Sequence, residues 1–326
     1  MIDKYIEIVG SSNHRLNAMA AGSREAIRVA LSKKYAKVGV TIVDDIADLE
    51  ALVAKKPDLV VLGMKLILLD PAQGYDDSPK VWLSDYLEEH GIAYTGSDAA
   101  GLAIQADKPA AKQKVMDAAL QSSAYFISTI KQPTFAHNLE FPLFVKPTDL
   151  GGSKGIDEMS VVYSQSELEA KIGAIHAEYG SDALVEEYLS GREFSVAVVM
   201  QKSGDLLAMP IEIASPADTK GNSFLSKAVK KADSERVLAV EDAQLKDKLS
   251  ALAIGVFEAL GSRDYARIDM RLDGMGTPSF IEANPMPGLS SHGYLSRCFA
   301  INHDVGYEDM VLAITHLGLE RAGSRG

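Results

Sequence analysis

The order of apolar runs in the first hundred residues constrains the fold more than any other feature of the chain. Short runs typical of strands alternate there with longer runs typical of helices. The expected strands are YIEIV, VGVTIV and DLVVLG, and the expected helices are about 14–34, IADLEALVAKK and SPKVWLSDYLEEH. Strands separated by helices pair in parallel, because the crossover returns the chain to the start of the next strand. The sequence therefore predicts an N-terminal unit built on a parallel sheet.

The third of these helices has clear end signals. Ser78 before Pro79 is typical of a helix start, and Gly91 follows His90 where the helix should end. The preceding run, LILLDPAQGYDD, is interrupted by proline and glycine, which favours a surface loop. We therefore expect a helix over 78–90 that follows an irregular loop.

Charge and hydropathy exclude several classes of protein. Lysine and arginine total 33 against 45 aspartates and glutamates, and the net charge of −12 argues against a nucleic-acid partner. No apolar run approaches the roughly 18 residues of a membrane helix, and MIDKYIEIVG lacks a secretion signal. A cytoplasmic protein without a membrane partner is expected. The single cysteine, Cys298, can form no internal disulfide and is expected to be a buried or partly buried spectator.

Two further units are expected after the parallel sheet. The second opens with the helix KPAAKQKVMDAAL and continues with strands FPLFVK, MSVVY and DALVEEYL around a helix at about 166–179. The third contains strands EFSVAVVM and LLAMPIEIA, the polar segment 215–236, interpreted as a mobile loop, and the helix LKDKLSALAIGVFEAL. The predicted domains are an α/β domain over 1–103 and two α+β subdomains over 104–190 and 191–326.

The segment Arg267–Pro285, RIDMRLDGMGTPSFIEANP, has the alternation of two strands around a Gly-rich turn, and a β-hairpin is expected. With the loop centred in GMGT, Asp269 lies opposite Glu282, and Arg267 lies opposite Asn284. The residues expected on the other face are Ile268, Met270, Ile281 and Ala283. The polar face of the hairpin therefore holds two carboxylates.

Two facing carboxylates need a neutralising partner. Like charges about 5 Å apart on neighbouring strands destabilise each other unless a proton is shared or a cation lies between them. Asn284 adds a neutral oxygen on the same face, and an all-oxygen set suits Mg²⁺ or Mn²⁺ better than Zn²⁺. The alternative is a solvated face on which Asp269 and Glu282 turn apart.

Two other segments have features suited to a nucleotide. Lys146 ends a strand before a loop with three glycines, whose backbone N–H groups could contact phosphate oxygens. Neither a Walker A motif nor GxGxxG occurs, so an ordinary hairpin loop is the alternative. In LVEEYLSGREFSV, Glu193 could accept hydrogen bonds from ribose hydroxyls, while a solvent-exposed acidic strand end is the alternative.

Taken together, these segments resemble the ATP-grasp enzymes. Lys108, Lys146 with the glycine loop, EEYLSGREF and RIDMRLD…FIEANPMPG occur in the order of that superfamily, and are most similar to the D-alanine:D-alanine ligase branch. The likeness extends from MAAGSREAIRVAL through HGIAYTGSDAAGLAIQADK to NPMPGLSSH. It implies an α/β protein of the ATP-grasp fold, in which an N-terminal parallel-sheet domain accompanies two α+β subdomains that clamp ATP.

The resemblance also implies the residues of the site. Those implied to bind ATP are Lys108, Lys146, Gly152 and Ser153 at the phosphates, Glu186 with the backbone of Glu187 and Leu189 at adenine, and Glu193 at the ribose. Those implied to bind two Mg²⁺ ions, or Mn²⁺, are Asp269, Glu282 and Asn284. The implied catalytic residues are Arg267 at the oxyanion, Gly288, and Lys220 at the γ-phosphate. Substrate contacts are expected from Ser291, His292, Gly293 and Tyr294.

The activity implied is an ATP-dependent carboxylate–amine ligation. A substrate carboxylate attacks the γ-phosphate, and an amine then displaces phosphate from the acylphosphate to form a peptide-type bond. The implied partners are small amino acids or amines, and family members are commonly homodimers. The alternative from another class is a regulatory or scaffold protein that binds the nucleotide and has lost catalysis.

The amino-acid side departs from the family pattern. Where the family has a Glu after the first strand, a Ser in the glycine loop and a Tyr in the mobile loop, this chain has Leu16, Gly152 and Gly221. The family's His-Gly segment is not recognisable in GMKLILLDPAQGYDD, and its Ser-Leu pair becomes Gly293-Tyr294. Losing a buried Glu that pairs with an ammonium weakens recognition by several kcal/mol unless another group replaces it. The sequence therefore argues against D-alanine as the best first substrate.

Overall fold

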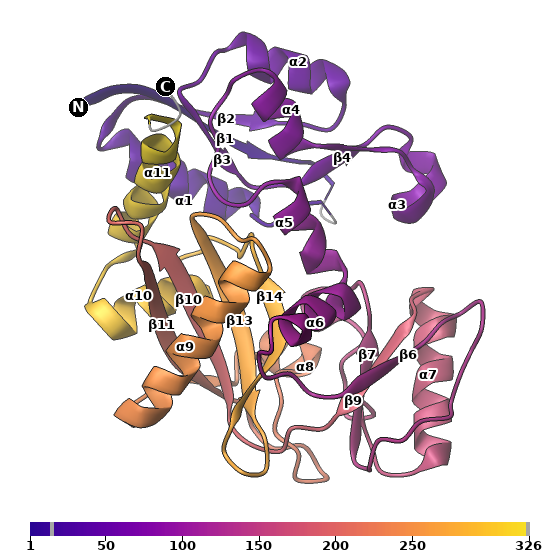
Figure 1. Ribbon diagram of the computed structural model, residues 1–326. Coiled ribbons are helices and arrows are strands. Elements are labelled where there is room, and N and C mark those ends of the chain that lie inside the picture. Colours follow the sequence, from indigo (N-terminus) through magenta and orange to yellow (C-terminus); the bar gives the residue numbers. More distant parts are fainter. Residues whose placement is uncertain (14–15, 324–326) are drawn as a thin grey trace.

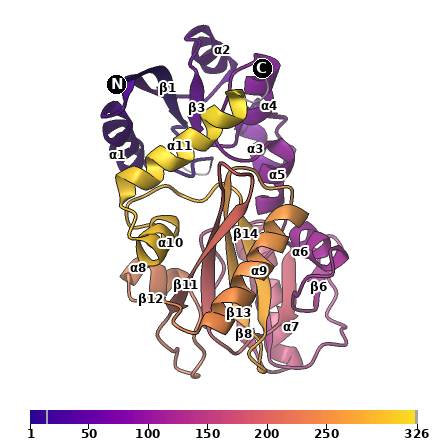
Figure 2. The same cartoon turned by 60° about the vertical axis from the view of Figure 1, so that its left-hand side comes forward.

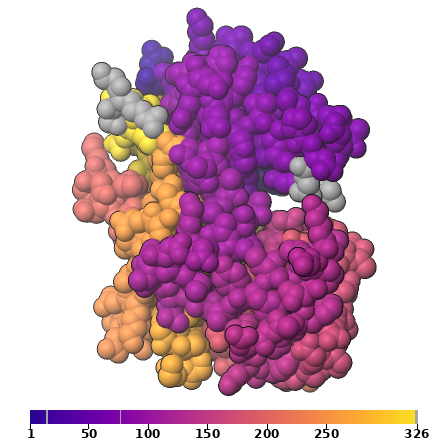
Figure 3. Space-filling view, turned by 45° about the vertical axis from the view of Figure 1, so that its right-hand side comes forward, coloured from indigo at the N-terminus to yellow at the C-terminus, as the bar shows by residue number. Residues whose placement is uncertain are grey.

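The computed structural model describes residues 1–13 and 16–323 and contains three main sheets (Figure 1). The N-terminal sheet lies above a central four-stranded sheet and a C-terminal five-stranded sheet, and Figure 3 shows the same stacking on the molecular surface. Within the described ranges, no helix has both the length and the apolar character needed to cross a membrane.

The N-terminal sheet has the order β2-β1-β3 and is parallel, as predicted. Its strands are β1 (Ile2–Gly10), β2 (Tyr35–Ile42) and β3 (Leu59–Leu62). One face packs against α1 (Ala21–Ser32) and α11 (Tyr307–Gly323), and the other packs against α2 (Ile46–Ala54). The last helix of the chain therefore completes the first sheet, and Figure 2 shows it running beneath that sheet.

Two predictions for this unit are wrong. The first helix begins at Ala21 rather than near residue 14, although His14 itself lies outside the described residues. The expected helix over 78–90 is instead a strand followed by a shorter helix. The elements of this stretch are β4 (Leu66–Leu68), a 3-10 turn (Pro71–Gln73), α3 (Gly74–Asp77), β5 (Lys80–Trp82) and α4 (Leu83–Glu89).

The run LILLDPAQGYDD is only partly a loop, because Leu66–Leu68 is buried and pairs antiparallel with β5. Ser78 does not start the helix. Its hydroxyl accepts a hydrogen bond from the backbone N–H of Asp70 and donates to the carbonyl of Pro79, which closes the connection between the two strands. Local end signals were therefore overridden by burial of the apolar strand.

The central sheet is antiparallel with the order β6-β9-β7-β8. Its strands are β6 (Tyr125–Ser128), β7 (Leu143–Pro147), β8 (Val161–Val162) and β9 (Ala183–Glu187). The apolar residues of α7 (Gln165–Tyr179) pack on one face. The chain enters this unit through α5 (Ala99–Ala103), a 3-10 turn (Ile104–Ala106) and α6 (Lys108–Asp117). The sequence prediction missed β6.

The C-terminal sheet is antiparallel with the order β12-β11-β10-β13-β14. Its strands are β10 (Glu193–Met200), β11 (Leu206–Ala214), β12 (Arg236–Ala239), β13 (Tyr265–Leu272) and β14 (Pro278–Asn284). Helix α9 (Ala243–Ala259) covers one face, and α10 (Tyr294–His303) covers part of the other. Cys298, on α10, is buried as expected.

The predicted hairpin register is confirmed. Asp269 pairs with Glu282, and Arg267 pairs with Asn284. Ile268, Met270 and Ala283 join the core under α9, as period-2 alternation requires.

A bulge next to Asp269 changes one side chain of the hairpin. Met270 pairs with Phe280 rather than Ile281, so Ile281 is the extra residue of β14. The prediction that Ile281 lies on the buried face is therefore wrong, because its side chain lines the cavity described below. The bulge turns the side chain of Ile281 toward the cavity, while Asp269 and Glu282 remain paired.

Candidate active site

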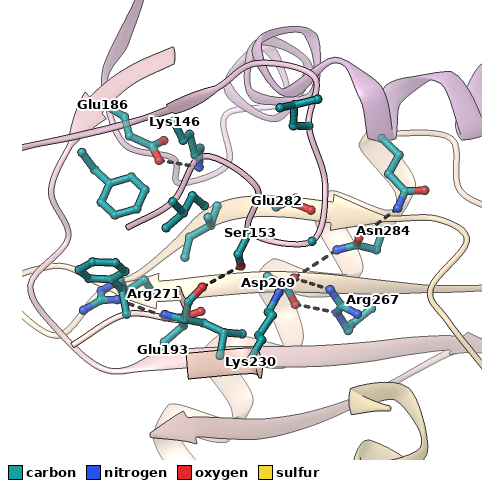
Figure 4. A pocket seen from close by; sticks show the side chains of 18 of the residues that line it. Lys146, Ser153, Glu186, Glu193, Lys230, Arg267, Asp269, Arg271, Glu282 and Asn284 are labelled. Atoms are coloured by element: carbon teal, nitrogen blue, oxygen red, sulfur yellow. Dashed lines mark hydrogen bonds and ion pairs between the residues drawn. The ribbon is translucent and has the colours of Figure 1, made fainter. Parts of the chain in front are cut away.

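A cavity of about 390 Å³ lies between the central and C-terminal sheets. Strands β7 and β9 contribute one wall, and the hairpin of β13 and β14 contributes the other (Figure 4). Lys146 and Glu186 lie at one end of the close-up, and Arg267 and Asn284 lie at the other. Of the predicted site residues, those that line the cavity are Lys146, Gly152, Ser153, Glu186, Glu187, Leu189, Glu193, Arg267, Asp269, Glu282, Asn284 and Gly288.

Asp269 is held by three neighbours. Arg267 donates from Nε and Nη2 to its two carboxylate oxygens at 2.9 and 2.8 Å. Ser195 Oγ donates at 2.6 Å and Asn284 Nδ2 donates at 3.1 Å. Burial disfavours the charged form, but the Arg267 charge and these hydrogen bonds outweigh it, so the pKa of Asp269 is lowered.

Glu282 faces the same cavity without such partners. Within residues 1–13 and 16–323 its carboxylate accepts no hydrogen bond and forms no ion pair. The same ranges contain no group of three or more His, Cys, Asp or Glu side chains that could hold a metal. The donor set of Asp269, Glu282 and the Asn284 amide therefore fits a hard divalent cation only if phosphate oxygens complete its coordination.

Glu186 is the centre of a buried charge cluster. Its carboxylate pairs with Lys146 Nζ at 2.6 Å and with Lys112 Nζ at 2.9 Å. Burial by itself would raise the pKa of Glu186, but the charges of Lys112 and Lys146 outweigh this effect and lower the pKa to about 2. Lys112 was not predicted, although it lies one helical turn after Lys108 on α6 and helical spacing could have found it.

Lys108 lies beside the cavity and contacts its wall. Its ammonium donates to the carbonyl of Leu150, which lines the cavity, at 2.6 Å. Burial lowers the pKa of Lys108, and the Lys146 charge acts in the same direction against nearby carboxylates. The amine is thus oriented by the strand-to-loop connection that leads to the glycine loop.

The glycine loop and the polar segment close over the cavity together. Gly152 and Ser153 have φ values of +67° and +59°, which tightens the loop. The Ser153 hydroxyl donates to the carbonyl of Leu225 at 2.8 Å, and the Leu225 N–H donates to Glu193 at 3.3 Å. The middle of segment 215–236 therefore forms part of the cavity wall.

In segment 215–236, Lys230 rather than Lys220 lines the cavity. Lys230 lies on α8 (Lys227–Ala232) and lines the cavity. Lys220 lies outside it, with its ammonium 3.6 Å from Glu167 and 5.3 Å from the centre of the Tyr163 ring. Burial, reinforced by the Arg267 charge, lowers the pKa of Lys230. The sequence contained only the Ser226 helix start as a signal, which could not decide which lysine faces inward.

Aromatic rings and an ion pair form the remaining wall. Phe144 stacks on Tyr188 at 6.3 Å between ring centres and meets Phe224 edge-on at 5.5 Å. Arg271 pairs with Glu193 at 3.2 Å, while burial raises the pKa of Glu193. Arg271 was also missed, although it continues the alternation of Arg267 and Asp269 along β13 and could have been identified from it.

The predicted substrate residues do not line the cavity. Ser291 and His292 are exposed, and Gly293 caps α10. The Tyr294 hydroxyl donates to Glu235 Oε1 at 2.6 Å, and the Arg267 guanidinium lies 5.6 Å from its ring centre. The sequence analysis also missed four residues that do line the cavity, namely Ala18, Gln105, Met286 and Pro287.

The chain is similar to proteins of a known family. Residues 102–316 match the family model described as "D-ala D-ala ligase C-terminus". A D-alanine–D-alanine ligase of Stutzerimonas stutzeri is 31% identical over 259 residues, which cover 78% of this chain and 77% of that protein.

Solved structures share the fold at lower identity. The D-alanine–D-alanine ligase from Bacillus anthracis complexed with ATP superposes with a TM-score of 0.74 at 21% identity, covering 100% of both chains. A D-Ala:D-Ser ligase from Enterococcus faecalis gives a TM-score of 0.68 at 20% identity, covering 97% of this chain and 99% of that one. The fold is therefore that of the ATP-grasp enzymes, and the chain belongs to the D-alanine–D-alanine ligase family of ATP-dependent ligases.

Proposed function

We propose that the cavity binds ATP with a divalent metal and joins a small carboxylic acid to an amine through an acylphosphate. The observation that carries the proposal is the facing pair Asp269 and Glu282 in the same cavity as Lys146 and Lys230. Anionic and cationic groups that converge on one pocket suit a polyphosphate whose charge is shared between metal and lysines.

The nucleotide would occupy the end of the cavity near Glu186. The rings of Phe144, Tyr188 and Phe224 offer apolar surface for a base, and backbone groups beyond Glu186 are available to it. Glu193 would accept hydrogen bonds from ribose hydroxyls. Lys108, Lys146 and the amides of Gly152 and Ser153 would bind the phosphates, with Glu187 and Leu189 contributing backbone at the base.

Asp269, Glu282 and Asn284 would hold the metal, which we take as two Mg²⁺ ions, with Mn²⁺ as a substitute. A bound metal would supply charge neutralisation at the phosphate oxygens. Arg267 already neutralises Asp269, so its guanidinium is available to the reacting centre only if this ion pair loosens when the metal binds. The remaining steps are carried by the chain itself.

In the reaction, a carboxylate oxygen of the donor acid attacks the γ-phosphorus of ATP, and the bond to the β–γ bridging oxygen breaks to release ADP. The amine then attacks the acyl carbon, phosphate leaves, and the amine gives up one proton. Arg267 and the N–H of Gly288 would stabilise the oxyanion of the second step. Lys230 would neutralise the transferred phosphoryl group, the role that the sequence assigned to Lys220.

Other features of the protein follow the same proposal. Residues 1–103 would form the substrate-side domain, and residues 104–190 and 191–326 would form the two halves that enclose ATP. Its substrates are small molecules, and we propose a homodimer. Consumption of ATP fits the cytoplasmic location expected from the sequence.

The test combines purified protein, ATP and Mg²⁺ with panels of carboxylic acids and amines, and measures phosphate release. Hydroxylamine should trap the acylphosphate as a hydroxamate in the presence of a competent acid. Glu282→Gln serves as the inactive comparison. Tight ATP binding without phosphate release for any combination would contradict ligation and favour a nucleotide-binding regulator.

A further inference from the structure

Tyr294, the first residue of α10, connects segment 215–236 to the cavity. Its hydroxyl donates to Glu235 Oε1 at 2.6 Å, and the Arg267 guanidinium lies 5.6 Å from its ring centre. Resting on the proposed function, we propose that Tyr294 and Glu235 are positioning residues that fix Lys230 and Arg267 relative to each other in the cavity. Tyr294 and Glu235 do not line the cavity themselves, so they act through these two cations.

Helix α8 cannot fix the position of Lys230 by itself. It has only six residues, and none of them is fully buried. A helix this short is not stable in isolation, because its few hydrogen bonds do not offset the cost of nucleation. Its ends are closed locally, by the Ser226 hydroxyl, which accepts from the Val229 N–H at 3.2 Å, and by the left-handed residue Asp233. Contacts with other parts of the chain must therefore hold the helix in place.

Two anchors hold α8, one before it and one after it. Before the helix, the Ser153 hydroxyl of the glycine loop donates to the carbonyl of Leu225 at 2.8 Å. After the helix, residues 233–235 lead to β12, which lies at the edge of the C-terminal sheet beside β11. Glu235 is the last of these residues, and its hydrogen bond with Tyr294 joins them to α10. Lys230 lies between the two anchors.

The ring of Tyr294 contacts the second cation. Asp269 accepts two hydrogen bonds from Arg267, at 2.9 and 2.8 Å, and the face of the Tyr294 ring lies against the same guanidinium. A planar guanidinium that stacks on an aromatic ring is restricted in its orientation. Burial and the hydrogen bond to Glu235 raise the pKa of Tyr294, so its hydroxyl remains a donor at neutral pH. One side chain therefore contacts Arg267 with its ring and anchors the segment of Lys230 with its hydroxyl.

The cavity does not retain the Lys230 ammonium without such an anchor. Lys230 and Arg267 both line the cavity and both approach Asp269 (Figure 4). Burial lowers the pKa of Lys230, the Arg267 charge acts in the same direction, and the opposing charge of Asp269 does not cancel the shift. A lowered pKa means that the ammonium is less stable in the cavity than in water. The Tyr294–Glu235 hydrogen bond opposes the release of Lys230 to solvent.

The first experiment removes the hydrogen bond and keeps the ring. Tyr294→Phe should lower kcat about tenfold and change the KM for ATP by less than about twofold, because Lys230 acts on the transferred phosphoryl group. Glu235→Leu should match it, while Glu235→Gln keeps an acceptor and should stay within about threefold of the wild type. Rates are measured as hydroxamate formation from ATP, Mg²⁺, hydroxylamine and the most active acid of the panel. Unchanged kcat in Tyr294→Phe and Glu235→Leu would overturn the proposal.

A second comparison tests whether Tyr294 acts through the two cations. In a Lys230→Met background, Tyr294→Phe should lower kcat by less than about twofold, because the amine that it positions is already missing. Tyr294→Leu removes the ring as well and should cost about a further threefold in either background, because Arg267 loses its aromatic contact. A full tenfold loss for Tyr294→Phe in the Lys230→Met background would show a general structural effect and refute the link to Lys230. Equal rates for Tyr294→Phe and Tyr294→Leu would refute the link to Arg267.

Tyr94→Phe is the matched control. Tyr94 donates to Glu88 at 2.6 Å, as Tyr294 does to Glu235, and the Arg263 guanidinium lies 5.9 Å from its ring centre. Tyr94 belongs to the core of the N-terminal unit and does not line the cavity. The kcat of Tyr94→Phe should stay within about twofold of the wild type. A tenfold loss in this variant would show that the effect is not specific to Tyr294.

Trypsin digestion gives a measurement that does not depend on ligation. Lys227 and Lys231 are exposed, and cleavage after them reports local opening of α8. Tyr294→Phe should be cleaved there at least about threefold faster than the wild type, while its Tm falls by no more than a few degrees. Equal cleavage rates would contradict the anchor, and a misfolded Tyr294→Phe leaves the two Glu235 variants to decide.

Failure of this inference can be told apart from failure of the proposed function. If the wild type forms no hydroxamate with any acid while ATP still raises its Tm, ligation is wrong and the positioning role falls with it. If the wild type is active and Tyr294→Phe equals it in kcat and in cleavage rate, ligation stands and the positioning role is wrong.

Discussion

The two ends of the cavity differ in how their polar groups are satisfied. At the nucleotide end, Glu186 is already paired with two lysines and Glu193 with Arg271. At the acid end, near Arg267 and Asn284, the Glu282 carboxylate makes no hydrogen bond or ion pair with the described residues. The nucleotide end is therefore organised before ligands bind, whereas the acid end leaves a carboxylate for its ligands to satisfy.

The largest expected effect concerns the metal ligands of the β13–β14 hairpin. Glu282→Gln and Asp269→Asn remove negative charge that the metal needs, and each should reduce ATP-dependent phosphate release by roughly 10³-fold, or about 4 kcal/mol. Phosphate release at saturating ATP and Mg²⁺ is the measurement.

The matched control is Asp205→Asn in the exposed turn between β10 and β11. It should keep activity within about twofold, as surface substitutions normally do. Wild-type turnover in both hairpin variants would remove the metal assignment and leave the facing carboxylates without a role.

The same two ends differ in how well the sequence predicts them. The hairpin register follows from period-2 alternation around a Gly-rich turn, so Asp269 and Glu282 could be paired from sequence alone. The bulge that turns Ile281 into the cavity could not, because it arises from packing rather than from pattern.

Residues of the acid end were missed for a different reason. Gln105 and Ala18 lie in separate segments of the N-terminal half, and only tertiary packing brings them to Gly288. Lys112 and Arg271, by contrast, follow helical and strand spacing from residues that were predicted. Periodicity can therefore predict further site residues along one helix or strand, but it cannot predict which helices and strands come together in the fold.

The second expected effect compares two lysines of segment 215–236. Lys230→Met removes a cation from the cavity and should lower kcat by roughly 10²-fold, the cost of losing one group that stabilises developing charge. Lys220→Met should change kcat by less than about threefold, because its ammonium lies at Glu167 outside the cavity. The measurement is the kcat of both variants by steady-state kinetics. The reverse order of effects would restore the assignment made from sequence.

The third expected effect concerns stability at the nucleotide end. Glu186→Gln leaves Lys112 and Lys146 buried without their counter-charge, which should cost about 3 kcal/mol and lower Tm by several degrees. The neighbouring Glu187→Gln, on an exposed residue, is the control and should cost less than about 1 kcal/mol. Equal losses in the two variants would show that the charge cluster adds nothing specific.

The pH dependence of this effect has a fixed sign. The folded-state pKa of Glu186 is lowered to about 2, below the value of about 4.3 for an unfolded chain. Its contribution to stability is therefore complete above about pH 4.3 and is lost as pH falls from there towards 2. As the pH falls from about 4.3 towards 2, the Tm of the wild-type protein should therefore decrease more than the Tm of Glu186→Gln, because only the wild type loses this contribution.

The smallest expected effect concerns Lys65, whose charge interacts with those of Glu282 and Lys108. Because burial lowers its pKa to about 8, its ammonium loses its proton as pH rises through 8, and the positive charge near Glu282 and Lys108 decreases. The KM for the donor acid, which binds as a carboxylate, should then rise about threefold to tenfold between pH 7 and 9, an effect of about 1 kcal/mol. Lys65→Met should raise KM at pH 7 and flatten this part of the profile, while Lys248→Met on the exposed face of α9 should not. A step of the same size that persists in Lys65→Met would assign the titration to another group.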